Sequence, residues 1–485
     1  MFNKHPKRSD TAPIARLFPY VPCTGWDSGV KIKIRKEVPD MKKVLALLLA
    51  ALLLVGLMPL ALADDVITLD MYFPVSVGGG PDQLISNLCD QFHEEYPNIV
   101  INPIYAGSYA DTRTKVFAAI SAGQTPAISM LFSIDLYQLV STGKLLKYND
   151  FCTTEEDLAW LNGFYDGFME NSRLPNDEGG YDVYGIPWQR STIILYWNKE
   201  AFAEVGLDPE KAPETWAELV EYAQKLVKKD ENGNTIRYGI QIPSDKAGYA
   251  YWMLQTMTLT QGGQNLMSAD GTEVYFDNPK VIAGLKFWKS LSDMGVMPEA
   301  PKWANTRSDF VNGNVAMMYH TTGQLSSVKK EATFEFGTAY LPAASTEYGA
   351  LDSSLGSPTG GGNFYLFQDS NITPEMTEAA FTFVKWMTSD MDRVAQWSID
   401  TGYCATRPEA YETELLQTYA AEFPQCLTAR DQLENAYAEF SVYDQGTVQD
   451  ILDTAIEEVM TGLKDAETAL AEAQEAADAI LEDYR

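Results

Sequence analysis

The sequence predicts an α/β protein in which mostly parallel sheets are flanked by helices. Short apolar runs alternate with segments in which apolar residues recur every three or four positions. Glycine and proline separate the two kinds of segment, as in "GGGPDQ" at residues 78–83. At 485 residues the chain is long enough for more than one hydrophobic core, and it contains neither an internal repeat nor a linker long enough to separate independent domains.

The first part of the chain predicts an alternation of strands and helices. Three apolar runs are predicted strands: residues 66–76, 98–106 and 126–132. Between the first two, Leu84, Leu88 and Phe92 recur at helical spacing, and a second helix before the third strand is expected to stop at Gly123. Because parallel strands need a long crossover between them, usually a helix, this order predicts parallel pairing.

The same alternation returns later in the chain. Further strands are predicted at residues 191–198, 230–243 (after a turn), 314–320 and 363–368, and further helices at 214–229, 278–295 and 377–389. The part beyond Thr447 is rich in Ala and Glu. It predicts a surface pair of helices whose inward face carries Ile451, Ile456, Val459 and Leu463.

The segment "MKKVLALLLAALLLVGLMPLALA" (residues 41–63) has the layout of a secretory signal peptide. Two lysines precede an apolar run, and the run ends in small residues. A membrane anchor is the alternative, since about 20 apolar residues suffice to span a bilayer. Pro59 and the small-residue exit favour cleavage, which we expect after Ala63. The protein is therefore expected to be exported, to the periplasm or the outer surface of the cell.

Residues 1–40 are unusual because a signal peptide normally opens a chain. The stretch carries eight Lys/Arg against four Asp/Glu and has no apolar period. We interpret it as an over-extended gene start, with Met41 as the true first residue. A disordered leader is the alternative.

The formal net charge of −31 argues against a nucleic-acid partner. Binding of nucleic acid depends on Lys and Arg that neutralise phosphates, and an acidic surface mainly promotes solubility. The exported part contains four cysteines, whose spacing fits no zinc pattern: Cys89, Cys152, Cys404 and Cys426. Both disulfide bridges and free buried thiols are compatible with the sequence.

Motifs for catalysis or for cofactors are missing from the sequence after Ala63. It has two histidines, His93 and His320, and no HExxH, GxSxG or GxxxxGK[ST] motif. We therefore expect no metal, no other cofactor and no enzymatic activity. A secreted glycoside hydrolase stays an alternative, because the separation of two carboxylates cannot be read from a sequence.

Small polar, aromatic and glycine residues gather at the ends of predicted strands. In open α/β sheets ligands bind beyond the carboxyl ends of the strands. Aromatic faces can stack on a sugar while polar groups beside them fix its hydroxyls. These positions are Tyr109, Ser133, Asp135, Thr322, Gly361 and Gly362, with the cluster Trp188, Arg190 and Ser191 ahead of the strand at 191–198. Each aromatic residue alone is better explained as core, but their recurrence beside polar residues predicts a binding cleft.

Several motifs resemble one known family. They are "GSY...K...AISAGQTPAI" (107–128), "PWQRSTIILYWNKEAFAEVGLDPEKAPETWAELVEYAQKL" (187–226), "FVNGNVAMMYHTTGQL" (310–325), "GGGNFYLF" (360–367) and "TGYCATRPEAY" (401–411). Over nearly all of residues 66–470 the chain is similar to the extracellular solute-binding proteins of ATP-binding-cassette importers, in the family that binds sugars and glycerol phosphates. The second and third motifs are specific in combination.

The resemblance implies a periplasmic-binding-protein fold of two α/β lobes joined by several hinge crossovers. The first lobe would comprise residues 64–192 and 343–400, and the second residues 193–342 and 401–485. Trp188 to Thr192 would then line the cleft beside the hinge.

The resemblance also implies individual ligand contacts. The pattern of the glycerol-phosphate-binding members places contacts at Tyr109, Ser191, Thr322, Gly361 or Gly362, and Tyr403. Two positions depart from it. Ser133 stands where a glutamate is expected, with Asp135 as a possible replacement, and no arginine is found near Ser441, which we place in the helical tail.

The missing arginine makes a phosphate-bearing ligand less expected, since a charge-assisted hydrogen bond from Arg binds phosphate strongly. Arg190 could supply a substitute cation, or could be a surface or ion-paired residue. We therefore expect an oligosaccharide or glycoside, with glycerol 3-phosphate or a glycerophosphodiester as the alternative. Trp188 and Trp252 are the residues predicted to stack on it.

The function implied is high-affinity capture of a small polar solute by hinge closure. The implied partners are a membrane permease and its cytoplasmic ATPase, and the protein is expected to be a monomer. A sensor protein that shares the fold and feeds a receptor is the alternative of another class.

Overall fold

The computed structural model describes residues 66–74, 81–246, 249–346 and 357–485. The predicted leader and signal peptide lie outside these residues. Among the helices of the described ranges, none has the length and apolarity needed to cross a membrane.

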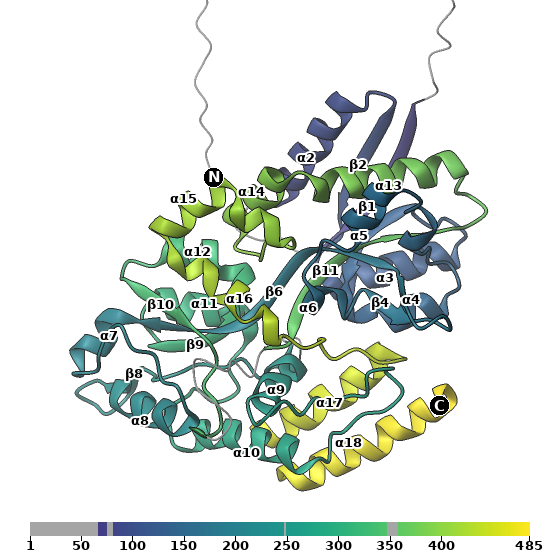
Figure 1. Cartoon of the computed structure of the whole chain (residues 1–485). Helices are drawn as coiled ribbons and strands as arrows, with labels where there is room; N and C mark the ends of the chain where they lie inside the picture. Colours follow the sequence, from purple (N-terminus) through teal and green to yellow (C-terminus); the bar gives the residue numbers. More distant parts are fainter. Residues whose placement is uncertain (1–65, 75–80, 247–248, 347–356) are drawn as a thin grey trace, which may run out of the picture. The chain divides into compact units, whose positions relative to one another are not determined.

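A seven-stranded sheet forms the framework of the fold (Figure 1). The strand order is β10–β6–β11–β3–β1–β2, and β9 also pairs with β6. The strands are β1 (Ile67–Phe73), β2 (Ile99–Tyr105), β3 (Ile128–Phe132), β6 (Gly185–Asn198), β9 (Met317–Thr321), β10 (Phe336–Ala339) and β11 (Thr359–Leu366). Two short hairpins complete the β structure: β4 (Arg173–Pro175) with β5 (Tyr181–Val183), and β7 (Lys228–Lys229) with β8 (Thr235–Arg237).

The α/β class is confirmed, but the sheet is mixed rather than mostly parallel. β1 pairs in parallel with β2 and β3, as the strand–helix alternation predicts. β6 and β11 pair antiparallel with each other, β11 with β3, and β6 with β9 and β10. The predicted strand at 230–243 pairs in parallel only through isolated bridges, from Tyr238 to Val315 and from Gln241 to Met318. The antiparallel pairs of the long strand β6 therefore dominate this part of the sheet.

The helices cover the sheet and follow strong local signals. For example, Ser108 caps α3 in a capping box with Asp111, and the helix ends ahead of Gly123, as predicted. The helices are α2 (Pro81–Glu95), α3 (Tyr109–Ser121), α4 (Leu136–Ser141), α5 (Glu155–Leu161), α6 (Asp166–Met169), α7 (Lys199–Glu204), α8 (Trp216–Leu226), α9 (Ala250–Leu259), α10 (Pro279–Asp293), α11 (Trp303–Val311), α12 (Leu325–Glu331), α13 (Pro374–Ser389), α14 (Met391–Thr401), α15 (Glu414–Glu422), α16 (Thr428–Asp431), α17 (Gln445–Met460) and α18 (Ala466–Leu481).

The apolar residues form two large core clusters. The first core cluster consists of buried residues between 69 and 188 and between 364 and 416. The second consists of buried residues between 193 and 319 and between 440 and 481, together with Tyr109, Phe132 and Ile134. Residues from 403 to 416 therefore pack with the first cluster, although the sequence analysis assigned residues 401–485 to the second lobe.

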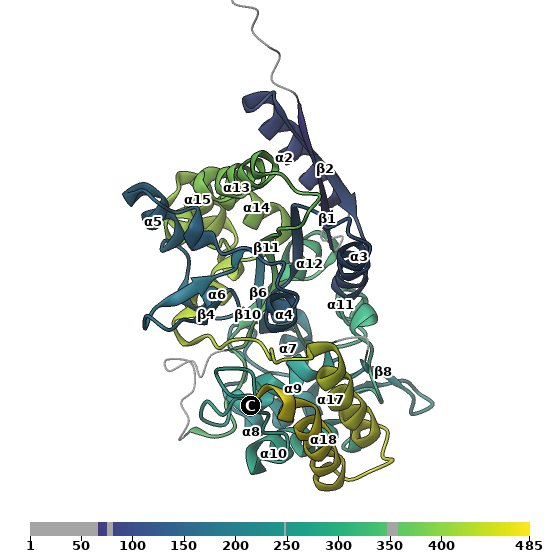
Figure 2. The same ribbon diagram turned by 90° about the vertical axis from the view of Figure 1, so that its right-hand side faces the viewer.

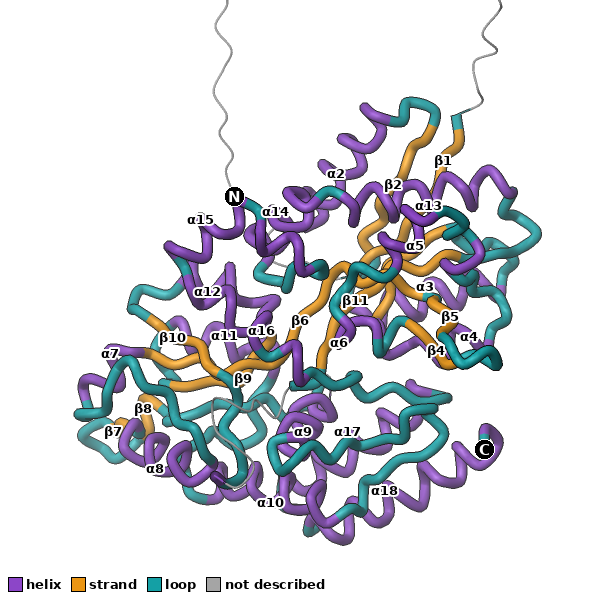
Figure 3. The backbone as a smooth tube through the Cα atoms, in the orientation of Figure 1, coloured by secondary structure: helices purple, strands orange, loops and turns teal. Residues whose placement is uncertain are grey.

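Strand β6 serves both clusters. Its first part, Gly185 to Thr192, pairs with β11, and its last part, Ile193 to Asn198, pairs with β9 and β10. Figure 3 shows β6 running from the strands around β11 to those around β9. Every one of its 14 residues is buried. A single continuous strand thus joins the two core clusters.

The C-terminal helices belong to the second core cluster. α17 and α18 pack side by side and both contact α10 (Figure 2). Ile456 and Val459 are buried and Ile451 packs against the cluster, as predicted. The prediction for Leu463 is wrong, since its side chain is 77% exposed. Leu463 follows Gly462 in the turn between the two helices, where the helical period no longer applies.

The sequence left open whether the cysteines form disulfide bridges, and the described residues answer this. Cys89, Cys152, Cys404 and Cys426 are all free, and the first three are buried. The stability of the fold therefore depends on packing and hydrogen bonding within these clusters rather than on disulfide bridges.

Candidate ligand-binding site

The place where β6 meets β11 is built around glycines. Gly361 has φ of +105°, and a Cβ there would lie 1.8 Å from the carbonyl oxygen of Gln189 on the neighbouring strand. A Cβ on Gly360 would lie 2.3 Å from the Trp252 ring, and one on Gly362 would lie 3.0 Å from the Tyr109 hydroxyl. The glycines therefore let two aromatic side chains and a second strand approach the backbone of β11 closely.

Aromatic residues from distant parts of the chain meet beside these glycines. Tyr109 stacks on Phe132 at 4.5 Å between ring centroids, and Phe132 contacts Tyr249 edge-on at 5.9 Å. Tyr249 contacts Trp303 at 5.0 Å, and Trp303 lies 6.3 Å from Trp252. We call these five residues the aromatic group. Tyr249 and Trp303 are half-buried, so part of the group faces outward.

Tyr403 adjoins the aromatic group from a third direction. Its ring lies against Gly323, which follows Thr322 after β9. Burial raises the pKa of the Tyr403 phenol to about 12, and the nearby Tyr109 hydroxyl opposes this rise through a hydrogen bond. The structure thus brings together four residues predicted for the site, namely Tyr109, Thr322, Gly362 and Tyr403.

Arg190 lies fully buried in a polar network beside the aromatic group. Its Nη2 donates to Thr359 Oγ1 at 2.9 Å and its Nη1 donates to Asn363 Oδ1 at 3.3 Å. Its Nε has no partner among the described residues. Burial lowers the pKa of the guanidinium, and the nearby Glu439 carboxyl opposes that shift. Arg190 is therefore neither a surface residue nor part of an ion pair within hydrogen-bond distance.

The contacts near the end of the β6–β11 pairing tie the two parts of β6 to other segments. The Thr192 backbone N–H donates to Thr322 Oγ1 at 3.4 Å, and the Cys404 N–H donates to the Arg190 carbonyl at 2.8 Å. Gln432 Nε2 donates to the Ile193 carbonyl at 3.2 Å. Three segments that are distant in sequence, around Thr322, Cys404 and Gln432, thus contact β6 at this point, which we call the crossing point. Ser191 lies between them and is also buried.

Ser133 and Asp135 lie in a short 3₁₀ turn after β3, and both are buried. Asp135 Oδ1 accepts a hydrogen bond from Arg113 Nη1 at 3.0 Å, whereas Asp135 Oδ2 and Ser133 Oγ have no partner among the described residues. Burial raises the pKa of Asp135 to about 6, against the lowering effect of Arg113. Ser441 donates to the Ile134 carbonyl at 2.7 Å. It lies in the loop before α17, so its predicted helical position is wrong.

The two tryptophans predicted to stack on the ligand lie in different surroundings. Trp252 is next to Gly360, and its Nε1 donates to the Pro358 carbonyl at 3.3 Å. Trp188 belongs to the first core cluster, where its ring neighbours are Trp397 at 5.0 Å and Phe364 at 6.0 Å. Among the described residues Trp188 has no ring contact with the aromatic group, because it packs in the first core cluster, whereas Trp252 belongs to the second.

Four residues at the site were missed by the sequence analysis: Phe132, Tyr249, Trp303 and Glu439. Glu439 offered a usable signal, since it is the only charged residue in the stretch "YAEFSVY" (437–443), which apart from Ser441 is otherwise apolar and aromatic. Phe132, Tyr249 and Trp303 offered none, because aromatic residues at the end of a strand or the start of a helix resemble ordinary core residues. Tyr249 has a left-handed backbone (φ of 62°), which turns the chain at the start of α9.

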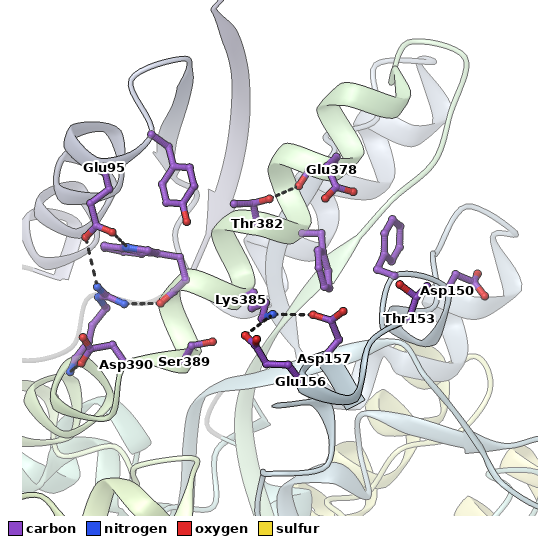
Figure 4. A pocket seen from close by; sticks show the side chains of 15 residues that line it. Glu95, Asp150, Thr153, Glu156, Asp157, Glu378, Thr382, Lys385, Ser389 and Asp390 are labelled. Atoms are coloured by element: carbon purple, nitrogen blue, oxygen red, sulfur yellow. Dashed lines mark hydrogen bonds and ion pairs between the residues drawn. The ribbon is translucent and has the colours of Figure 1, made fainter. Parts of the chain in front are cut away.

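A separate cavity of about 930 Å³ lies between the end of α2, the start of α5 and helix α13 (Figure 4). Its two basic side chains already have partners. Lys385 Nζ lies 2.7 Å from Asp157 Oδ1, and the Arg393 guanidinium stacks 3.4 Å over the Trp386 ring. None of the residues predicted for the ligand site lines it. The unpartnered groups around Arg190 make the region of the aromatic group the better candidate for a ligand.

The family follows from a comparison with known proteins. The family model for bacterial extracellular solute-binding proteins matches residues 87–425. This chain is a bacterial extracellular solute-binding protein. The resemblance inferred from its motifs is thereby confirmed.

The curated relatives of this solute-binding protein include two glycerol-phosphate binders. It is 24% identical over 449 residues to the sn-glycerol-3-phosphate-binding periplasmic protein UgpB of Escherichia coli K12, covering 89% of this chain and 96% of that one. It is also 24% identical over 431 residues to UgpB of Pectobacterium atrosepticum, with 85% and 91% covered.

Solved structures show that the solute-binding protein has the predicted two-domain fold. It matches a cyclic α-maltosyl-1,6-maltose binding protein from Arthrobacter globiformis with a TM-score of 0.70 and 22% identity, over 86% of this chain and 99% of that one. UgpB from Mycobacterium tuberculosis in complex with glycerophosphocholine gives a TM-score of 0.71 at 22% identity, with the same coverage. Maltose-bound MalE3 of T. maritima gives 0.71 at 21% identity, with 85% and 100% covered.

Proposed function

We propose that this solute-binding protein captures an oligosaccharide or glycoside outside the cytoplasmic membrane and delivers it to an ATP-binding-cassette permease. The observation that carries the proposal is the aromatic group, which lies beside buried polar side chains with unpartnered atoms. Flat aromatic faces stack on the C–H faces of sugars, and polar groups fix the positions of hydroxyls. Tyr249 and Trp303, which are only half-buried, are the members we assign to direct stacking.

We infer that the mechanism is closure of two lobes around the solute. Tyr109 comes from the part of the chain that precedes the crossing point in β6, and Trp303 and Thr322 come from the part that follows it. Ligand can shift an open–closed equilibrium only through contacts that are better in the closed form. A site built from both sides of the crossing meets this condition. The proposed lobes are residues 64–192 with 343–400 and residues 193–342 with 401–485, and packing favours moving residues 403–416 to the first.

Glycerol 3-phosphate or a glycerophosphodiester is the second candidate. It is favoured by the names of the curated relatives, which bind sn-glycerol 3-phosphate, and by the complex of a structural neighbour with glycerophosphocholine. Against it, Ser441 stands where an arginine was expected, and Arg190 is held by Thr359 and Asn363. The sugar is therefore the main proposal.

The proposal involves no covalent chemistry, in line with relatives that are named as binding proteins. The signal peptide proposed at residues 41–63 would direct export. A sensor that shares the fold would bind solute in the same way, and the genes next to this one would distinguish it from a transport protein.

Tyr249→Ala and Trp303→Ala should each weaken binding of the cognate sugar about five- to tenfold. Aromatic contacts are worth about 1 kcal/mol beyond the area they bury, which corresponds to such a change in Kd. Isothermal titration calorimetry of residues 64–485 with maltose and maltotriose measures the effect. X-ray scattering on the same samples should record compaction of the wild type on binding.

Trp216→Ala is the matched control. Trp216 is also half-buried, and it stacks on Phe287 at 4.0 Å, where it adjoins the second core cluster but not the aromatic group. Its replacement should leave the Kd unchanged. If all three variants bound the sugar with the same affinity, the aromatic group would not be part of the binding site. If the sugar were chemically converted, the protein would be an enzyme instead.

A further inference from the structure

Two buried carboxyl groups, Glu439 near Arg190 and Asp135 near Glu439, are each held by one oxygen only. Glu439 Oε1 accepts a hydrogen bond from the Tyr251 hydroxyl at 2.7 Å, and Asp135 Oδ1 accepts one from Arg113 at 3.0 Å. The second oxygens, Glu439 Oε2 and Asp135 Oδ2, have no partner among the described residues. Both side chains are at most 1% exposed. A buried acceptor without a partner is costly, so these oxygens mark a place for another polar group.

The backbone around Glu439 is fixed, so the free oxygen is not a sign of a loose loop. Its N–H donates to Asn171 Oδ1 at 2.7 Å, and Asn171 Nδ2 donates to its carbonyl at 2.9 Å. Asn363 Nδ2 donates to the Asn171 carbonyl at 3.0 Å, which connects this segment to β11. The carboxylate is thus held rigidly beside the strand that carries the glycines of the site.

Other unpartnered polar atoms share this region. Arg190 Nε and Gln189 Nε2 are free donors, and Ser133 Oγ is a free hydroxyl. A chain of hydrogen bonds links Arg190 to Asn363 and Asn363 to Tyr365, and the Tyr365 hydroxyl donates to the Ser133 carbonyl at 3.5 Å. The charges also face one another. Burial raises the pKa of Glu439 to about 8, Arg190 opposes this rise and Asp135 adds to it.

The atoms without a partner therefore comprise two donors, two carboxyl oxygens and one hydroxyl, and the hydroxyl can both donate and accept a hydrogen bond. A solute hydroxyl both donates and accepts, so several hydroxyls can satisfy all of these atoms. A phosphate group mainly accepts, and above pH 8, where both carboxyl groups are ionised, it would leave their oxygens facing its own negative oxygens. We propose that Glu439 and Asp135 bind hydroxyl groups of the solute through their free oxygens and thereby discriminate against phosphate-bearing solutes.

This inference rests on the proposed function and assigns its specificity. Calorimetry at pH 9, where both carboxyl groups are ionised, tests it on residues 64–485 with maltose, maltotriose, glycerol 3-phosphate and glycerophosphocholine. We expect the wild type to bind a sugar at least tenfold more tightly than either phosphate compound. Glu439→Ala and Asp135→Ala should each weaken sugar binding at least tenfold. Glu439→Gln, which puts an amide donor in reach of the solute, should shift the ratio of the two affinities toward phosphate at least tenfold.

Asp453→Asn is the matched control. Asp453 is another buried carboxyl beside Tyr251, but both of its oxygens are occupied, by the Tyr251 N–H at 2.8 Å and by Gln449 Nε2 at 3.2 Å. It should bind every probe as the wild type does. Thermal unfolding of each variant verifies that it is folded, and the near-isosteric Glu439→Gln keeps the test valid where an alanine variant does not fold.

The outcomes separate the two proposals. Unchanged sugar affinity in the Glu439 and Asp135 variants would overturn this inference and leave the proposed function standing. Tighter binding of a phosphate compound than of the sugars by the wild type would also overturn it. Failure of the wild type to bind any of the four probes would instead contradict the proposed function itself.

Discussion

Replacing Gly361 by alanine should prevent the protein from reaching its native fold at 37 °C. The backbone there has φ of +105°, which L-residues rarely adopt, and the new Cβ would lie 1.8 Å from the Gln189 carbonyl oxygen. That neighbour is backbone in the middle of the sheet, so no side-chain rotation can relieve the overlap. We expect a loss of at least about 4 kcal/mol in the free energy of unfolding, measured by urea denaturation.

Gly313→Ala is the control for this prediction. Gly313 also has a left-handed backbone (φ of +74°), but a Cβ there would meet nothing within 4 Å. It should cost only the conformational strain, about 1 kcal/mol. If the two variants unfolded at the same urea concentration, the close approach of β6 and β11 would be wrong.

The protein without ligand should become more stable as the pH falls from 8 to 6.5. Burial raises the pKa of Glu439 to about 8, of Asp453 to about 7 and of Asp135 to about 6. A carboxyl with a raised pKa in the folded state stabilises that state fully below its unfolded pKa, and loses this contribution as the pH rises through the folded value. Each fully protonated group contributes about 1.4 kcal/mol per pH unit, so we expect a total gain of about 2–3 kcal/mol.

Two other kinds of titratable group determine the pH range over which this stabilisation is expected. Carboxyls with a lowered pKa, such as Asp157 at about 2, are ionised in both states above pH 5 and do not contribute. Below about pH 6.5 the buried His320 opposes the trend, because its pKa is lowered to about 3 and unfolding then takes up a proton.

Urea denaturation at pH 8.0, 7.2 and 6.5 measures the pH effect. The double variant Glu439→Gln/Asp453→Asn, which removes the two groups with the highest pKa values, should lose most of it. A wild type whose stability is constant over this range would show that these carboxyls are ionised in the folded protein.

The framework of the fold and its parallel strands could be predicted from local signals, but the antiparallel strands could not. Capping by Ser108 and the stop at Gly123 are encoded within a few residues, so α3 was found. The antiparallel pairing of β6 with β11 joins residues more than 160 positions apart in the chain. Periodicity contains no information on such a pairing. The exposure of Leu463 was missed for a similar reason, since a turn ended the helical period before it.

The site was predicted in part, through residues at the ends of strands. Tyr109, Thr322 and Gly362 follow or open regular elements, so a rule about strand ends could find them, and their role in binding stays a prediction. Trp188 has the same type of position in the sequence, yet its side chain packs against Trp397. Which side chains of a strand line a site depends on the strands and helices that pack against that strand in the fold. Glu439 was missed because an irregular loop far along the chain carries it into the site.

The location of α17 and α18 has a consequence for biosynthesis. These helices fill the second core cluster against residues from 193 onward, so that cluster stays incomplete until about residue 481 has left the ribosome. Contacts between segments so distant in sequence also form slowly. The second core cluster of the nascent polypeptide therefore remains unfinished throughout translation, which suits the export that the proposed signal peptide would direct.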